Sequence, residues 1–271
     1  MFPLIWHKDS IDNININHVI TLGNTSKGNH FYLDKKYSII IPTHSKRADL
    51  LNKNIIAPLF NAKSQYLEKV FIYWNDYDLK LPIPPSLYYL ERQYDYRVQV
   101  VNLKERNLNS RFLIPENLYT ETILSHDDDL TLYIKHLDKS FIEYLNSNYS
   151  NRISGKYATS CTSDNSRKDS NMIITNMAFL NVNMLKLYNL DKYKESRDYV
   201  SQMNNCEDIL MNYIVSKETN QNAAYLFFQY KTNFDKFGIS SAPDHLSKRT
   251  NCCKKFNEMF GIDTLKKVKF N

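Results

Sequence analysis

Short β-branched runs alternate with stretches of helical spacing through the first half of the chain, and this order limits the folds open to it. Apolar, β-branched runs of this length are typical of buried strands. The predicted strands are Tyr37 to Ile41, ended by Pro42, then Val70 to Trp74, Val98 to Val101, and a strand through Thr120, Thr122 and Ile123. Helical or turn-forming segments between them cover Arg47 to Phe60, Leu87 to Arg92 and Asn109 to Tyr119. The alternation predicts an α/β fold with a Rossmann-like, mostly parallel sheet flanked by helices.

Polar residues follow the predicted strands at the positions where each strand ends. In doubly wound sheets the ligand binds outside the carboxyl ends of the strands. The residues expected at that edge are Thr43 to Arg47, Asn75, Asn102 to Arg106 and Asp127 to Asp129. A ligand site is therefore predicted there.

Three consecutive carboxylates, Asp127, Asp128 and Asp129, close the fourth predicted strand. Adjacent like charges repel, so the triplet is poorly suited to stabilising a fold and well suited to holding a cation. Oxygen-only ligands favour Mg²⁺ or Mn²⁺, ions that proteins commonly share with substrate phosphates. An acidic turn after a strand is the simpler explanation, and the triplet alone does not decide between the two.

Composition places the chain among ordinary globular proteins and narrows its partners. Of its 271 residues, 42% are hydrophobic and 24% are charged. The net charge of +6 is too small and too dispersed to indicate a nucleic-acid partner, but it suits a phosphate-bearing ligand. No run approaches the length of about 20 apolar residues that a membrane span needs, and the first residues are too polar for a signal peptide. The expectation is a soluble chain.

The second half is more mixed, and its pattern shows no internal repeat and no clear boundary. We expect helices at Leu132 to Leu145, Asn183 to Leu190, Asp208 to Val215 and His245 to Met259. Strands are predicted at Met172 to Phe179 and Ala223 to Gln229, with loops at Asn151 to Arg167 and Phe234 to Pro243. Residues 1–35 are polar and irregular and are interpreted as an N-terminal arm. Residues 36–271 are then a single domain in two halves, 36–130 and 131–271.

A second acidic stretch, Asn205-Cys206-Glu207-Asp208-Ile209-Leu210-Met211-Asn212, opens a helix that looks buried. Capping of a helix N-terminus by Asp or Glu is common and would be sufficient to explain the two carboxylates. A functional role for the two carboxylates is better supported when this stretch is considered together with two other sequence phrases. Ser110-Arg111-Phe112-Leu113 precedes the acid triplet, and Pro243-Asp244-His245-Leu246-Ser247-Lys248-Arg249 follows downstream.

In this order, the phrases resemble the glycosyltransferase domain of the exostosin family over residues 36 to 265. Several spaced motifs in one order are far more specific than any single motif. The resemblance implies a GT-A fold with a nucleotide-binding half, 36–130, and an acceptor and catalytic half, 131–271. It implies a divalent cation, Mn²⁺ or Mg²⁺, and transfer with retention from a UDP-N-acetylhexosamine (UDP-GlcNAc or UDP-GalNAc) to a glycan or glycoprotein acceptor. The resemblance does not decide whether the protein forms a homo-oligomer.

Matching positions imply roles for individual residues. Asp129 would be the metal ligand, and Asp127 and Asp128 would contact ribose or sugar. Asp208 would lie beside the reacting sugar, and Arg249 would approach the diphosphate. Contacts to base, ribose or donor are implied for Thr43, Arg47, Asn75, Arg106 or Asn107, and Arg111. An exposed surface charge explains Arg47 and Arg106 equally well, and we expect structural roles for His126 and His245.

Four cysteines, Cys161, Cys206, Cys252 and Cys253, lack zinc-site spacing, and composition alone does not choose a disulfide pair. The resemblance implies a Cys206–Cys252 bond. Other positions depart from the family pattern: Asn176 stands where Gly is usual, Thr159 and Cys161 replace an Arg and a His, and Pro42 replaces a polar residue. These departures bear on the sugar and the acceptor.

Two alternatives remain from the sequence. One is a nucleotide-sugar-binding protein without transfer, which Asn176 favours, and the other is a cation-dependent nucleotidyltransferase. The compartment is also open, because a cysteine bond suits the secretory lumen whereas the absence of a signal peptide suits the cytoplasm. Retention through a covalent intermediate or through same-face attack is likewise undecided.

Overall fold

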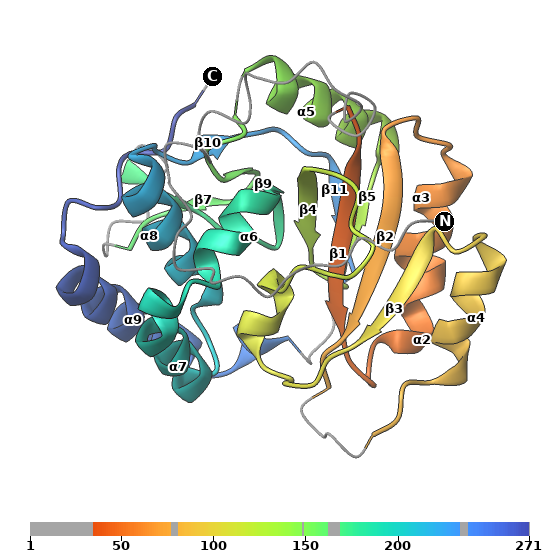
Figure 1. Ribbon diagram of the computed structural model, residues 1–271, viewed down its shortest axis with the longest axis horizontal. Helices are drawn as coiled ribbons and strands as arrows, with labels where there is room; N and C mark the ends of the chain where they lie inside the picture. Colours follow the sequence, from red (N-terminus) through yellow and green to blue (C-terminus); the bar gives the residue numbers. More distant parts are fainter. Residues whose placement is uncertain (1–34, 77–80, 148, 162–168, 234–237, 271) are drawn as a thin grey trace, which may run out of the picture.

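A seven-stranded sheet runs through the computed structural model, which describes residues 35–76, 81–147, 149–161, 169–233 and 238–270 (Figure 1). The strand order is β10-β6-β9-β4-β1-β2-β3, and all neighbours are parallel except the two pairs that β9 makes. Six strands therefore end at one edge of the sheet, and β9 begins there. The bounds are β1 Tyr37–Thr43, β2 Leu67–Trp74, β3 Val98–Asn102, β4 Thr122–His126, β6 Ser154–Gly155, β9 Met177–Asn181 and β10 Ala224–Tyr225. The predicted mostly parallel sheet is confirmed.

Strand β1 continues through Pro42 to Thr43, so the prediction that Pro42 ends the strand was wrong. The pairing of β1 with β4 stops at Ile40, whereas its pairing with β2 reaches Thr43 opposite Trp74. Alternate residues of a strand direct their N–H groups to opposite neighbours. The N–H that Pro42 lacks would point toward β4, which no longer pairs with β1 at this position. The sheet therefore loses no backbone hydrogen bond at Pro42.

The helix predicted at Arg47 to Phe60 is present as one run with a widened middle. Its parts are α2 Ala48–Leu51, a π-helical segment Asn52–Ile56 and α3 Ala57–Asn61. Helix α4, Pro85–Gln93, agrees with the prediction for that region. The segment predicted as helix or loop after β3 begins with a short 3₁₀ turn, Leu108–Phe112.

The second half contains elements that the sequence pattern did not indicate. Helix α7 was not predicted, the predicted strand Met172 to Phe179 is two strands, and the described part of the predicted loop from Asn151 carries β6 and β7. The remaining residues of that loop, 162–167, the first residues of the other predicted loop, 234–237, and most of the arm, 1–34, lie outside the described residues. The further bounds are β5 Leu130–Leu132, α5 Ile134–Asn146, β7 Ala158–Thr159, β8 Met172–Ile173, α6 Val182–Tyr188, α7 Lys194–Met203, α8 Glu207–Thr219, β11 Tyr230–Thr232 and α9 His245–Phe260.

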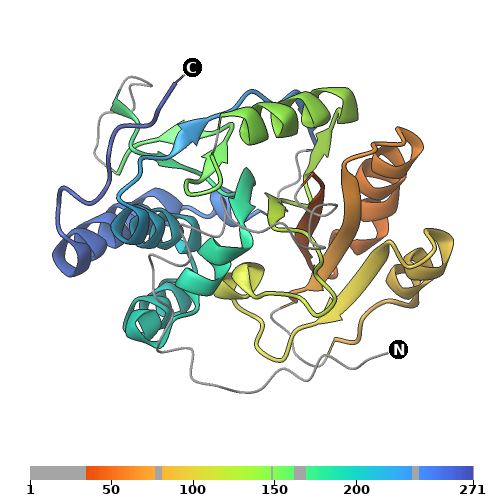
Figure 2. The ribbon, with the colours of Figure 1, turned by 45° about the horizontal axis from the view of Figure 1, so that its top comes forward.

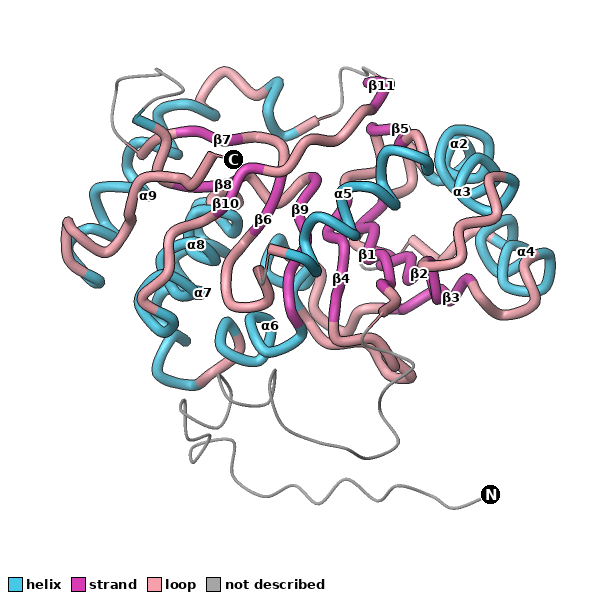
Figure 3. Tube along the Cα trace, turned by 90° about the horizontal axis from the view of Figure 1, so that it is seen from above, coloured by secondary structure: helices cyan, strands magenta, loops and turns pink. Residues whose placement is uncertain are grey.

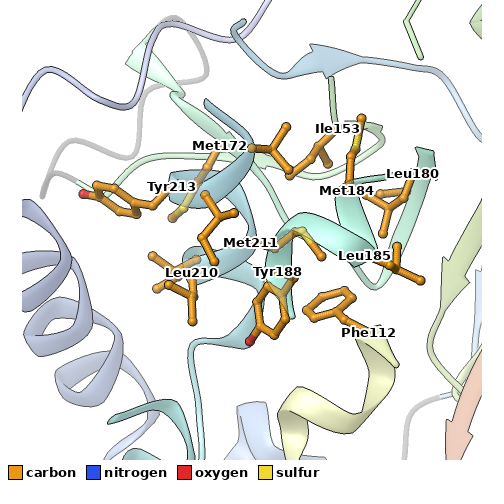
Figure 4. Close-up of a cluster of buried hydrophobic side chains, with 14 of the residues drawn as sticks. Phe112, Ile153, Met172, Leu180, Met184, Leu185, Tyr188, Leu210, Met211 and Tyr213 are labelled. Atoms are coloured by element: carbon orange, nitrogen blue, oxygen red, sulfur yellow. The ribbon is translucent and has the colours of Figure 1, made fainter. Parts of the chain in front are cut away.

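Helices cover both faces of the sheet, and each face has its own apolar core (Figures 2 and 3). Side chains alternate along a strand, so Ile39 and Ile41 of β1 join the core beneath α2 to α5, whereas Ile40 joins the core beneath α6 to α9. Figure 4 shows the second core, in which Leu210 and Met211 of α8 lie close to other labelled apolar side chains. Helix α8 is thus buried along its first ten residues.

Two disulfides join α9 to other segments of the second half. Cys206–Cys252 confirms the implied pair, and Cys161–Cys253 is a second bond that was not predicted. Adjacent residues of α9 therefore hold two segments that are far apart in the sequence. Within the described part of the chain, no helix has the length and apolar character needed to cross a membrane.

Candidate active site

Strand ends and one helix start bring the two acidic stretches together at the carboxyl edge of the sheet. Asp127 directly follows β4, and its N–H donates to the carbonyl of Asn176 at 3.0 Å, just before β9 begins. Thr43 ends β1, the neighbour of β4 on the other side. From the facing layer, the first turn of α8 carries Glu207 and Asp208, both buried.

Asp128 is held by two side chains from the β1 end of the site. The Thr43 hydroxyl donates to Asp128 Oδ2 at 2.8 Å, and the Arg47 guanidinium donates to Oδ1. Only 5% of the Asp128 side chain is exposed, against 32% for each of Asp127 and Asp129. Burial raises the pKa of Asp128, and Arg47 and Thr43 oppose that rise. The contact of Asp128 with a ribose or sugar stays a prediction, since both its oxygens have protein partners here.

Arg111 joins the two acidic stretches. Its Nη1 donates to Glu207 Oε1 at 2.9 Å and its Nη2 donates to Asp127. Burial disfavours the charge of this guanidinium, but the two flanking carboxylates together raise the pKa of Arg111. Phe112, the next residue, packs at 4.8 Å between ring centroids against Tyr188 and fixes the 3₁₀ turn in the second core. The separate groups of acids predicted to meet in the fold do meet.

Asp208 and Arg249 form a bidentate ion pair. Nη1 lies 2.9 Å from Oδ1, and Nη2 lies 3.0 Å from Oδ2. Burial opposes ionisation of Asp208, but Arg249 and the N–H of Ile209 hold the pKa of this carboxyl below its usual value. The backbone N–H of Ile209 donates to Asp208 Oδ1 at 2.8 Å. Asp208 is therefore ionised and fixed in orientation.

The start of α8 is shaped by an unusual backbone. Cys206 has a φ of 79°, a left-handed conformation that is costly for a residue with a Cβ. The Asn205 side chain accepts the Cys206 N–H at 2.8 Å, and the disulfide ties Cys206 to α9 one turn after Arg249. Together these contacts hold Asp208 against Arg249.

The residues expected near the base lie in two adjoining loops. The side-chain amide of Asn75 donates to the carbonyl of Asn107 at 3.1 Å, so the loops after β2 and β3 are joined. The side-chain oxygen of Asn75 is buried without a hydrogen-bond partner among the described residues, whereas the Asn107 side chain caps the 3₁₀ turn at the N–H of Ser110. Arg106 donates to Asn102 Oδ1 at 3.2 Å and to backbone carbonyls of the β2 loop. The predicted ligand contacts of these residues remain predictions.

The donor set fits a divalent cation that a phosphate would help to hold. Asp129 is partly exposed, and Arg47 Nη2 is 3.4 Å from its Oδ2. Among the described residues, no group of three or more His, Cys, Asp or Glu side chains is placed to bind a metal alone. Mg²⁺ and Mn²⁺ sites with one or two carboxylates plus substrate phosphates are common. Asp129, with Asp127 beside it, fits that chemistry.

Both histidines differ from metal ligands in their surroundings. His126 is fully buried, and burial lowers its pKa to about 4. His245 Nδ1 lies 3.1 Å from the side-chain amide of Asn205, at the start of α9. The full burial of His126 and the contact of His245 with Asn205 agree with structural roles, although neither ring nitrogen of His126 has a hydrogen-bond partner among the described residues.

Glu207 is the site residue that sequence reasoning missed. It was grouped with Asp208 as a capping acid, but its carboxylate pairs with Arg111 inside the protein. The sequence did contain a signal for Glu207: it lies between Asp208 and Cys206, a cysteine expected to form a disulfide. Helix capping was a sufficient explanation for a glutamate at this position. The contact with Arg111 spans 96 residues of sequence, so a local pattern cannot predict it.

Comparisons with known proteins agree with the geometry. The chain is 28% identical over 214 residues to the exostosin-like-3 homolog of Caenorhabditis elegans, which covers 76% of this chain and 25% of that protein. It is 27% identical over 212 residues to glucosamine inositolphosphorylceramide transferase 1 of Arabidopsis thaliana, with 72% and 26% covered. Exostosin-1 of Mus musculus is 28% identical over 216 residues, with 74% and 28% covered. The chain thus spans about a quarter of the length of these relatives.

Solved structures share the fold. GalNAc-T7 with UDP, GalNAc and Mn²⁺ superposes with a TM-score of 0.55 at 10% identity, covering 83% of this chain and 50% of that one. S. aureus TarS 1–349 in complex with UDP gives 0.50 at 11% identity, covering 84% and 67%. These likenesses confirm the GT-A fold. The model of the glycosyl transferase family 64 domain matches residues 37–271, and the chain therefore belongs to this family, that of the exostosins.

Proposed function

We propose that the domain is a retaining, metal-dependent glycosyltransferase that moves an N-acetylhexosamine from a UDP donor to a glycan or glycoprotein acceptor. The observation that carries this proposal is the meeting of the two acidic stretches across Arg111. UDP-GlcNAc and UDP-GalNAc are the proposed donors. The family membership and the naming of several relatives as exostosins support the choice of reaction.

Each part of the site has a role in breaking the bond between sugar and diphosphate. Mn²⁺ or Mg²⁺, when bound at Asp129, would neutralise negative charge on the leaving diphosphate. Arg249 is the protein's own cation for that charge, and preorganised groups of this kind are usually the largest catalytic term. Asp208, held ionised by Arg249, orients the sugar or stabilises positive charge at its anomeric carbon.

The roles of the remaining residues follow from their positions. Thr43 and Arg47 hold Asp128 and form the ribose side of the site. The side-chain oxygen of Asn75 is buried without a hydrogen-bond partner among the described residues, so it is the proposed acceptor for the N–H of a uracil base, with Asn107 beside it. Arg111 keeps Asp127 in place, and Arg106 braces the loop after β2.

The test is a donor screen that measures UDP release in Mn²⁺ and separates the three candidate functions. We expect UDP release from an N-acetylhexosamine donor, with retained configuration of the product by NMR. Asp129→Ala should reduce release at least about 100-fold, because the leaving charge loses its metal. Asp198→Ala, an exposed acid on α7, is the matched control and should keep the wild-type rate.

Other outcomes contradict parts of the proposal. Full activity in EDTA would contradict the proposed metal dependence. Release of pyrophosphate would identify a nucleotidyltransferase. Donor binding without transfer or hydrolysis would leave a binding protein, the alternative that Asn176 raised. The backbone carbonyl of Asn176 accepts the Asp127 N–H, so residue 176 is next to the acid triplet along the sheet edge.

A further inference from the structure

Two tyrosines from distant segments meet beside the acid triplet. Tyr157 follows β6, and Tyr230 begins β11. Their ring centroids are 5.5 Å apart and their planes differ by 61°, so the rings meet edge to face and are called the tyrosine pair. Both side chains are partly exposed, and both rest on the edge of the core beneath α2 to α5. Neither belongs to the acidic or basic groups already described.

Strand pairing sets Tyr230 next to the residues after the triplet. β11 is antiparallel to β5, with Tyr230 opposite Leu132 and Thr232 opposite Leu130. One residue beyond β11, the N–H of Asn233 donates to the carbonyl of Asp129 at 2.7 Å. The Tyr230 backbone therefore lies one strand away from the chain that leaves the acids.

Sheet topology sets Tyr157 at the same edge. β6 is antiparallel to β9, which is antiparallel to β4, so β6 and β4 point the same way and end together. Tyr157 is two residues past the end of β6, as Asp127 is one residue past the end of β4. Its carbonyl accepts the N–H of Ile174 at 2.8 Å, in the segment that also supplies the carbonyl for Asp127. The negative charges of Asp129 and Asp127 contribute, after burial and Tyr230, to a raised pKa of Tyr157.

The order along this edge separates two ends of the site. β1, β2 and β3, with Thr43 and Asn75, lie on one side of β4, and β9 and β6, with Tyr157, lie on the other. The proposed donor has its nucleotide over the first group and its diphosphate at the triplet. A second sugar that receives the transferred group must approach from another direction. Tyr157, with Tyr230 in contact with it, lies on the side of the triplet away from the proposed nucleotide position.

We propose that Tyr157 and Tyr230 form the acceptor subsite, which takes a hexopyranose with its apolar ring face against one tyrosine and a hydroxyl against the other. Aromatic rings with a polar tip suit a ligand that has apolar C–H faces and hydroxyl edges. This inference rests on the proposed function, since it assigns the second substrate of that same site.

Saturation-transfer NMR tests the subsite with methyl β-D-glucopyranoside, methyl β-D-galactopyranoside and methyl α-D-mannopyranoside, each in the presence of UDP and diamagnetic Mg²⁺. Tyr157→Ala and Tyr230→Ala are compared with Tyr66→Ala. Tyr66 is a matched control because it also makes a T-shaped contact at 61°, with Phe141 at 5.7 Å, but it precedes β2 at the opposite edge of the sheet. UDP affinity and the unfolding midpoint are measured for every variant.

We expect wild type and Tyr66→Ala to bind at least one glycoside, with roughly 3- to 10-fold weaker binding in each subsite variant and unchanged UDP affinity. Tyr157→Phe should retain part of the affinity, because it keeps the ring and loses the hydroxyl. Wild-type affinity in both alanine variants would overturn the subsite, as would absence of binding of all three glycosides to wild type. Failure of the proposed function would show separately, as absence of UDP binding by the wild-type protein.

Discussion

At the scale of single residues, Arg111 explains how two acidic stretches far apart in the sequence share one site. Three adjacent aspartates followed by a glutamate–aspartate pair would repel strongly at close range. Arg111 pairs with one carboxylate from each stretch, and Arg249 pairs with Asp208. Arg47 pairs with Asp128 and also lies 3.4 Å from a carboxylate oxygen of Asp129. Each acid of the two stretches thus has a cationic partner, and Asp127 and Asp129 have the more accessible carboxylates.

Loss of the Glu207 charge should weaken the fold as well as the site. Glu207→Gln leaves the buried Arg111 with one carboxylate instead of two, and breaking a buried ion pair costs about 3 kcal/mol. Urea unfolding measures this cost. Asp198→Asn, which breaks an exposed pair with Lys194, is the control and should cost less than about 1 kcal/mol. Equal costs for the two variants would contradict the buried junction.

His126 should make the fold sensitive to mild acid. Burial disfavours the charged ring and lowers the pKa of His126 to about 4 in the folded protein, against 6.5 for an exposed histidine in the unfolded chain. Above pH 6.5 the ring is neutral in both states and contributes nothing. Below 6.5 the unfolded chain binds a proton that the folded protein does not, so stability falls until about pH 4, by about 3 kcal/mol in total.

The comparison of wild type with His126→Leu isolates this effect. Free energies of unfolding from urea titrations at pH 7 and pH 4.5, in EDTA to keep metal from the neighbouring acids, give the slope for each protein. The variant should lose less stability over that interval than wild type does. Equal losses would mean that the ring takes up its proton inside the fold.

Sequence reasoning at this scale found acids and bases but not their pairing. Asp208 and Arg249 were both singled out as site residues, and the structure adds that they bind each other. Asp128 was expected to face the ligand, yet Thr43 and Arg47 occupy its oxygens. The residues of these pairs are 41 to 85 positions apart in the sequence, so a local pattern cannot predict that they contact each other.

At the scale of elements, the widened helix after β1 depends on a neighbouring strand. Pro58 in α3 has no N–H, so the carbonyl of Asn54 loses its normal helical donor. The hydroxyl of Thr131 in β5 donates to that carbonyl at 2.7 Å, and Asn233 in turn donates to the hydroxyl at 2.8 Å. The apolar spacing of this region predicted a helix, but the π-helical turn needs a donor that only the folded protein supplies.

Removal of that donor tests the dependence. Thr131→Val keeps the shape of the side chain and leaves the Asn54 carbonyl without its hydroxyl partner, at a cost of about 1 to 3 kcal/mol. The control is Thr250→Val on α9, where the exposed hydroxyl donates to the carbonyl of Leu246 within the same helix. Urea unfolding should show a larger loss for Thr131→Val, and a loss no greater than that of the control would contradict the argument.

The missed elements have physical reasons. Helix α7 buries only Ser196 and Val200, so it lacks the apolar stripe by which amphipathic helices are recognised. The run from Met172 was predicted as one strand because its residues are apolar, but the chain turns at Thr175 and Asn176 to pair first with β7 and then with β4. By contrast, buried strands such as β1 and β2 have continuous β-branched or aromatic runs and were placed correctly.

At the scale of the whole molecule, α9 is the element that secures the second half. It provides Arg249 to the site and two adjacent cysteines to separate crosslinks. The resemblance implied the Cys206–Cys252 bond. The Cys161–Cys253 bond was missed because Cys161 was judged only as the replacement for a histidine, although two neighbouring cysteines in one helix indicate two partners.

The two crosslinks should differ in what they do for the site while having similar effects on stability. In the loop-entropy model, closing 46 or 92 residues of chain contributes about 4 to 5 kcal/mol each, so both paired removals should lower the unfolding midpoint alike. Cys206 directly precedes Glu207 and Asp208, whereas Cys161 touches neither acid. We therefore expect the Cys206→Ala, Cys252→Ala pair to reduce UDP release several-fold more than the Cys161→Ala, Cys253→Ala pair, measured well below both midpoints. Equal losses of UDP release would mean that the left-handed turn at Cys206 holds the acids without its disulfide.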